Sequence, residues 1–217
     1  ARVDGEHFDL QAYTRFLGLR SIKLMRAFSK KTKFLSSYNC IIYSGLISHM
    51  GLKNAQVWST NIVYCHSLPR FVYDLKDYYL TQAKWWQRPI LRWLIHYVKP
   101  RYEKSLSQMD IIIANSKNVQ GRLYKYLRRD SIVVYPPIDT KSFHWIEQGD
   151  YYLSSARVEK YKRVETIVRA FMLMPDKKLI VGSSWRDKRR LQKLAANYPN
   201  ISFAHSTDEK SWQELIG

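Results

Sequence analysis

The chain has 217 residues, 46% of them hydrophobic, which is enough to bury the core of one large domain or of parts of two. Its 36 Lys and Arg residues against 18 Asp and Glu residues give a net charge of +18, which favours an anionic partner: nucleic acid, an acidic membrane surface or a phosphorylated ligand. Two cysteines do not support a disulfide framework, and without a signal-peptide pattern or an apolar run of about 18 residues we expect any membrane association to be peripheral.

The first part of the chain alternates short apolar runs with longer amphipathic ones. The short runs are β-branched or aromatic and are bounded by Gly, Pro, Asn or Ser, as strands are. Such alternation is typical of an α/β fold with parallel sheets. In chain order it predicts a helix at 11–30, strands at 39–43 and 61–65, a helix at 84–107, a strand at 110–114, a helix at 118–127 and a strand at 131–135.

The pattern is interrupted at "YPPIDTKSFHW". Pro136 and Pro137 cannot continue a central strand, so the chain is expected to leave one sheet there and to begin another near Tyr151. The second part predicts strands at 151–155, 178–181 and 201–203 and helices at 163–172, 187–197 and 208–216. We therefore place a domain boundary within 136–150 and divide the chain into domains 1–145 and 146–217.

Four cations cluster in "SSARVEKYKRVETIVRAF", residues 154–171. A strand is expected to end at Ser155, and a loop with Arg157, Lys160, Lys162 and Arg163 then leads into an amphipathic helix. Ligands of open α/β sheets bind where strand carboxyl ends meet helix N-termini, and these N-termini favour phosphate. Cations are mildly unfavourable there unless an anion joins them, so the cluster indicates an anionic ligand. A solvated basic loop is the alternative.

This segment, with "IIIANSKNVQGRLYKYL" and "SIVVYPPIDTKSF", resembles the retaining glycosyltransferases of family 4 (group 1), which have the GT-B architecture of two Rossmann-like domains. The resemblance runs from about residue 61 to the end and is weaker over 1–60. It implies an acceptor-side domain at 1–145 and a sugar-nucleotide-binding domain at 146–217, both incomplete. The family's N-terminal glycine-rich loop and C-terminal Glu-x7-Glu motif do not occur, so we expect a fragment that is inactive alone.

In that family an arginine, followed five residues later by a lysine, binds the diphosphate of the sugar nucleotide, and the matching residues are Arg157 and Lys162. Breaking the anomeric bond leaves new negative charge on the diphosphate, which a metal or fixed cations must stabilise. Arg offers a planar fork of donors and Lys a compact charge. Because no Asp-x-Asp motif occurs, we expect no metal and no cofactor besides the nucleotide-sugar donor, which is a substrate.

The stretch "YCHSLPRFVYD", residues 64–74, follows the strand expected at 61–65. Family members often have a histidine here, near the reacting sugar, so His66 resembles a catalytic residue that positions the donor sugar or the acceptor. A histidine that bonds to its own loop is the alternative. Cys65 is expected in the core, because neighbours on a strand point to opposite faces.

The segment "PRFVYD" resembles one of bacterial and archaeal polysaccharide mannosyltransferases. This resemblance implies that Arg70 binds a phosphate of a lipid-linked acceptor and that Tyr73 or Asp74 binds a sugar hydroxyl. The alternative is that Arg70 and Asp74 pair with each other.

Two further candidates follow predicted strands. In "ANSK", Asn115 and Ser116 would lie at the substrate cleft between the domains, although Ser or Asn before a helix is more often an N-cap. Gly182 follows the strand at 178–181, where the family has a glycine-rich turn near the nucleotide, and a plain turn explains it equally well.

The segment "KWWQRPILRWLIHYVKPRYEKSLSQ" mixes aromatic and basic residues. At helical spacing, Trp86, Pro89, Ile90 and Trp93 form a stripe that by default belongs to the core. Alternatively, a basic, aromatic helix lies on an anionic bilayer surface.

The resemblance to family 4 implies a retaining glycosyltransferase that moves a hexose, with mannose as first candidate, from a nucleotide-sugar donor to a glycan or lipid-linked acceptor in polysaccharide biosynthesis. Its expected place is the cytoplasm, peripheral at the inner membrane face. The alternative is a basic nucleic-acid-binding protein, supported by the charge of +18 and the 14% aromatic content. Since no RRM, KH, helix-turn-helix or zinc pattern occurs, we expect no nucleic-acid partner.

Overall fold

The computed structural model describes residues 17–142, 148–156, 162–182 and 188–204. It has two compact units, Ala1–Pro136 and Pro137–Gly217, which are described separately below. The division falls between two prolines, whose rings prevent further strand pairing. The domain bounds of 1–145 and 146–217 stay a prediction.

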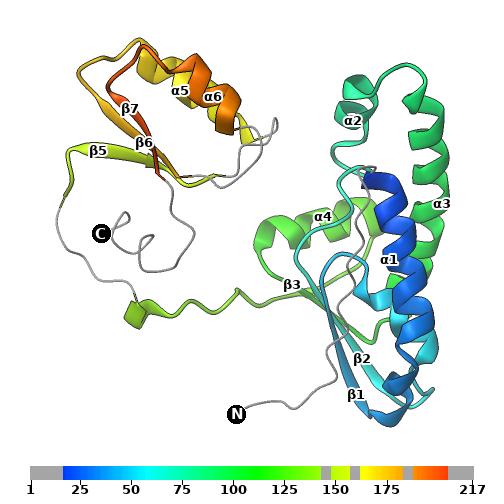
Figure 1. Cartoon of the computed structure of the whole chain (residues 1–217). Coiled ribbons are helices and arrows are strands. Elements are labelled where there is room, and N and C mark those ends of the chain that lie inside the picture. The colour runs from blue at the N-terminus through cyan, green and yellow to red at the C-terminus, as the bar shows by residue number, and fades with distance from the viewer. Residues whose placement is uncertain (1–16, 143–147, 157–161, 183–187, 205–217) are drawn as a thin grey trace. The chain divides into compact units, whose positions relative to one another are not determined.

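The first unit contains a parallel sheet whose strands lie in chain order: β1 (Cys40–Ser44), β2 (Thr60–Cys65), β3 (Ile111–Ala114) and β4 (Ile132–Val133). Its helices are α1 (Leu17–Lys31), α2 (Lys76–Gln82), α3 (Gln87–Ser107) and α4 (Lys117–Leu127), with 3₁₀ helices η1 (Lys33–Ser37) and η2 (Ser48–Asn54) (Figure 1).

One face of this sheet holds the main core. The strand order never reverses, and crossovers between parallel strands are right-handed in nearly all proteins, so successive crossovers put their helices on the same face. On that face the strands bury Ile41, Tyr43, Val63, Cys65, Ile112 and Ala114, in one cluster with Tyr102, Leu106, Val119 and Leu123 of α3 and α4. The opposite face is more open, and Ile42 is 66% exposed there.

A second cluster joins α1 and α3, which lie side by side (Figure 1). It contains Ile22 and Met25 of α1 and Leu94, Ile95 and Val98 of α3, and it also takes in Phe71 and Val72. The core stripe of α3 is therefore not the one that the sequence suggested by default. That assignment is wrong, since Trp86, Pro89, Ile90 and Trp93 are all exposed.

The second unit has a parallel sheet in the order β5 (Tyr151–Ser154), β6 (Lys178–Gly182) and β7 (Ile201–Ala204). Helices α5 (Val164–Met172) and α6 (Lys188–Leu194) pack on it, and η3 (Thr140–Ser142) precedes it. Its core consists of Val164, Val168, Phe171, Leu179, Val181, Leu191, Ala195 and Ile201.

The predicted fold class is confirmed: α/β, with two Rossmann-like units of the kind that form the GT-B architecture. Every predicted strand is present, although β4 is shorter than expected. The sequence missed α2 and the 3₁₀ helices, because short helices give little periodicity to detect. The predicted helix at 208–216 lies outside the described residues.

Candidate functional site

His66 lies directly after β2, at the carboxyl edge of the first sheet. Its side chain is exposed, and its Nε2 atom lies 3.0 Å from the Ser44 Oγ atom. The ring also packs edge-on against Tyr64, with centroids 4.9 Å apart. Two neighbours thus hold the imidazole at the edge where ligands of open α/β sheets bind. The catalytic role of His66 at the donor sugar or the acceptor stays a prediction.

Ser44 is a residue that the sequence analysis missed. It ends β1, and the register pairs it with Tyr64, so Ser44 and His66 are brought together by strand pairing across 22 positions of sequence. The next residue, Gly45, has a φ of 114°, a conformation that favours glycine. The sequence did contain a signal for Ser44, because a polar residue followed by glycine stands at the end of a strand. Only the register of β1 with β2, however, identifies His66 as its partner.

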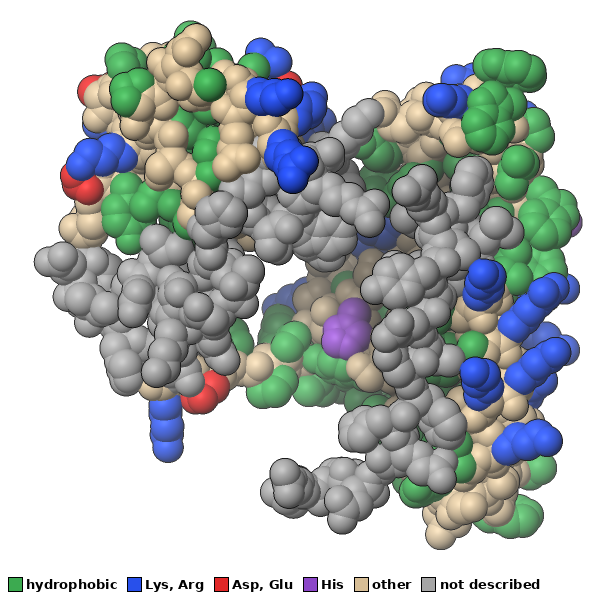
Figure 2. All heavy atoms as spheres, viewed as in Figure 1, with side chains coloured by type: hydrophobic (Ala, Val, Ile, Leu, Met, Phe, Trp, Pro, Cys, Tyr) green, Lys and Arg blue, Asp and Glu red, His purple; other side chains and the backbone are tan. Residues whose placement is uncertain are grey.

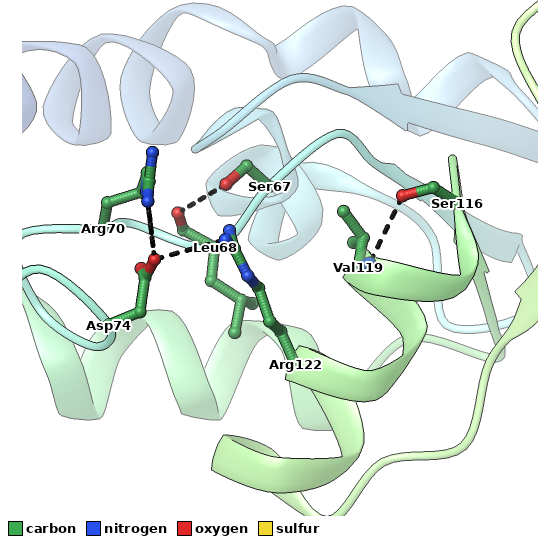
Figure 3. Close-up of polar contacts among 7 residues, drawn as sticks. All are labelled: Ser67, Leu68, Arg70, Asp74, Ser116, Val119 and Arg122. Atoms are coloured by element: carbon green, nitrogen blue, oxygen red, sulfur yellow. Dashed lines mark hydrogen bonds and ion pairs between the residues drawn. The ribbon is translucent and has the colours of Figure 1, made fainter. Parts of the chain in front are cut away.

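Arg70 and Asp74 pair with each other, as the alternative interpretation of the sequence proposed (Figure 3). Arg70 Nε and Nη2 donate to Asp74 Oδ2 at 3.1 and 2.9 Å. Arg122 of α4 joins them, with its Nη2 atom 3.3 Å from the same oxygen. Two guanidinium groups therefore share one carboxylate, which leaves the cluster with one net positive charge.

The chain holds this cluster in place through buried apolar neighbours. Leu68 is fully buried, and Phe71 and Val72 pack in the α1–α3 cluster, so buried side chains anchor the backbone on both sides of Arg70. The Leu75 N–H donates to the Arg70 carbonyl at 2.8 Å and closes a tight turn. The phosphate-binding role of Arg70 stays a prediction, because the pair with Asp74 neither requires nor prevents it.

The Tyr73 hydroxyl forms an intramolecular hydrogen bond, in which it donates to Glu103 Oε1 of α3 at 3.2 Å. Burial, and then the negative charge of Glu103, raise the pKa of Tyr73 well above its ordinary value. The phenol is thus neutral near neutral pH. It ties the loop after His66 to α3, and the predicted contact of Tyr73 or Asp74 with a sugar hydroxyl stays a prediction.

Asn115 and Ser116 follow β3 at the same edge of the sheet. Since Ala114 pairs with Cys65, Asn115 lies level with His66 in the register. Ser116 caps α4, because its Oγ accepts from the Val119 N–H at 3.3 Å (Figure 3), and it also donates to Asn115 Oδ1 at 3.2 Å. The N-cap interpretation is confirmed for Ser116, whereas a substrate contact of Asn115 stays a prediction.

Cys65 belongs to the core, as its position on the strand predicted. Burial raises the pKa of its thiol to about 11. The thiolate is the reactive form of cysteine, so the folded protein keeps Cys65 unreactive at neutral pH. Cys65 is therefore not a nucleophile paired with the neighbouring His66.

We expect a thiol reagent to modify Cys40 in the folded chain but to reach Cys65 only after unfolding, because Cys40 is exposed and Cys65 is not. Titration with a chromogenic disulfide at about pH 8 should count one thiol in buffer and two in denaturant. Two rapidly reacting thiols in the folded protein would contradict this placement of Cys65.

In the second unit, the structure describes two of the three candidate residues, Lys162 and Gly182. Lys162 is exposed and stands just before Arg163, the residue at the start of α5, whose φ of 53° is left-handed. Gly182 is buried at the end of β6. Arg157 lies outside the described residues.

The acidic residue in the first turn of α5 is engaged by arginines. Glu165 accepts two hydrogen bonds from Arg169 and also pairs with Arg190 of α6. The Arg169 hydrogen bonds first, and then that of Arg190, lower the pKa of Glu165. No group of three or more His, Cys, Asp or Glu side chains within the described ranges could hold a metal ion. The metal-independent mechanism stays a prediction.

No protein-family model matches the chain. The chain is similar to "Alpha-1,3/1,6-mannosyltransferase ALG2" of Saccharomyces cerevisiae (strain ATCC 204508 / S288c), with 28% identity over 203 residues, covering 81% of this chain. The chain is therefore a distant relative of a glycosyltransferase. The match covers 38% of that protein's length. It supports the resemblance to glycosyltransferases, but it comes from a yeast protein and does not support the narrower bacterial and archaeal assignment.

Proposed function

We propose that this chain is part of a retaining glycosyltransferase that transfers a hexose, with mannose as first candidate, from a nucleotide-sugar donor to a glycan or lipid-linked acceptor. The observation that carries the proposal is the similarity to a mannosyltransferase over 81% of the chain. Two parallel-sheet units, each with candidate residues after its strands, support it.

The donor diphosphate is assigned to the second unit. Arg157 and Lys162 provide fixed cations for the charge that develops on the diphosphate when the anomeric bond breaks. Gly182, at the end of β6, has no side chain that would keep a nucleotide from the backbone. With the donor diphosphate assigned to the second unit, we assign the binding of the reacting sugar and of the acceptor to the first unit.

In the first unit, His66 and Asn115 lie level at the carboxyl edge of the sheet, and His66 is oriented by Ser44. An oriented imidazole can donate to or accept from a sugar hydroxyl, which fixes the sugar in one reactive geometry. Arg70 and Arg122, with their shared carboxylate, provide the positive charge for an acceptor phosphate.

The function is tested by incubating the full-length protein with radiolabelled nucleotide-hexoses, one at a time, and extracted lipid-linked glycans. We expect transfer from one donor, with retention of anomeric configuration in the product. Replacing His66 by Ala should reduce turnover by about a hundredfold or more if it positions the reacting groups. No transfer from any donor, with tight retention on nucleic acid at high salt, would favour the nucleic-acid-binding alternative instead.

A further inference from the structure

Helix α3 carries a second apolar stripe, and the described residues leave about half of its side-chain surface exposed. Trp86, Ile90 and Trp93 recur at the spacing of one helix face and are 47%, 44% and 55% exposed, and the preceding Trp85 is 80% exposed. Figure 2 shows hydrophobic side chains gathered over the upper end of α3. Such a concentration of exposed tryptophans marks an interaction surface.

A basic pocket lies beside this stripe, between α2 and α3. It has a volume of about 420 Å³ and is lined by Lys76, Arg92, Ile95, His96, Lys99, Pro100 and Glu103. Its one carboxylate, Glu103, lies 3.9 Å from Lys99 Nζ and also accepts from Tyr73. Three Lys and Arg side chains therefore line the pocket with a single carboxylate, which already contacts Lys99 and Tyr73.

The two features occupy adjoining faces of the same helix. Arg92, His96 and Lys99 are spaced by four and three residues, so they form a stripe between the buried side of α3 and its exposed aromatic side. A helix with an apolar stripe, flanked by cations and anchored to a folded domain, suits the boundary between lipid headgroups and acyl chains.

We propose that this face, formed by Trp85, Trp86, Ile90, Trp93 and the pocket cations, docks on an anionic membrane surface. Tryptophan rings favour the headgroup level, where their apolar body is buried and their N–H stays wet. The cations beside them contact the phosphates of anionic lipids. None of the helices in the described part of the chain is long and apolar enough to cross a bilayer.

Charge argues against a second copy of this chain as the occupant. A two-fold contact would place the same patch on both subunits, so Arg92 and Lys99 would face like charges. An anionic lipid surface complements them instead. The proposed membrane contact involves the first unit alone and needs neither donor nor acceptor. The membrane contact can therefore be disproved while the proposed function holds, and the proposed function can be disproved while the membrane contact holds.

The test is co-sedimentation of the chain with vesicles of phosphatidylcholine alone and of phosphatidylcholine with phosphatidylglycerol. We expect binding to the anionic vesicles only, weakened by added salt. Replacing Arg92 and Lys99 together by Gln should weaken it roughly thirtyfold, and replacing Trp85 and Trp93 together by Ala about tenfold or more.

Matched controls separate this face from the general charge of the chain. Lys117→Gln with Lys125→Gln removes the same charge from exposed positions of α4, and Val57→Ala with Trp58→Ala removes other exposed apolar side chains, 100% and 74% exposed. Both controls should bind like the parent. The proposal would be overturned if the test and control variants lost vesicle binding equally, or if the parent did not bind anionic vesicles. It would also be overturned if the chain bound no vesicles but formed a dimer in sedimentation that the Trp85 and Trp93 replacements abolish.

Discussion

Replacing Arg157 or Lys162 by Ala in the full-length protein is expected to lower the turnover of sugar transfer by about a hundredfold to a thousandfold. Each side chain is assigned to a diphosphate whose negative charge grows as the anomeric bond breaks. Loss of one preorganised electrostatic contact of this kind costs roughly 2.7–4 kcal/mol of barrier height. Because the contact strengthens in the transition state, turnover should fall as well as donor affinity.

Stability should hardly change in these variants. Lys162 is exposed, and replacement of exposed side chains shifts the free energy of unfolding by only about 0.5 kcal/mol. Thermal unfolding and donor kinetics, measured on the same preparations, separate a chemical role from a structural one. Lys193→Ala, at an exposed position in the last turn of α6, is the control and should keep full activity. Parental turnover and donor affinity in both variants would remove the diphosphate assignment.

The sheets could be predicted because each strand is a short apolar run between turn residues. In β2, for example, the run from Asn61 to Cys65 alternates buried and partly buried residues, and Ser59 and Ser67 flank it. Pro136 and Pro137 mark the end of the first sheet for a local reason too, since proline lacks the donor that a central strand needs. Both signals can be read within a few residues.

The candidate site could be predicted only in part, because its contacts join distant segments. Local sequence indicated His66 and the pairing of Arg70 with Asp74, which are separated by one turn. It did not indicate Ser44 or Arg122, which strand pairing and the packing of α4 bring to them. The partner of a polar side chain across 22 or more positions depends on the register of the whole sheet.

Helix α3 shows that hydrophobic periodicity alone does not identify which face of a helix is buried. It has two apolar stripes, one with Leu94 and Val98 and the other with Trp86, Ile90 and Trp93. Both have helical spacing, and nothing local states which one meets α1. The tertiary structure buries the aliphatic stripe and leaves the aromatic one exposed, so the default assignment of the tryptophans to the core was wrong.

Replacing Leu68 by Ala is expected to destabilise the first unit by about 2–5 kcal/mol, because a buried Leu loses its transfer free energy and leaves a cavity. Leu68 is fully buried in the same cluster as Val63 and Leu123, two residues after His66 and two before Arg70. The loss should therefore loosen the loop that carries both candidate residues. Hydrogen exchange of the β2 and β3 amides reports the first unit specifically and should accelerate accordingly.

The conservative variant Leu68→Met keeps most of the volume and should cost less than about 1.5 kcal/mol. Leu173→Ala makes the same chemical change at a side chain that is 84% exposed, and it should leave exchange in β2 and β3 unchanged. If Leu68→Ala exchanged like the Leu173→Ala control, Leu68 would not hold this turn. The positions of His66 and Arg70 would then depend on their polar contacts with Ser44, Asp74 and Arg122 rather than on the core beneath them.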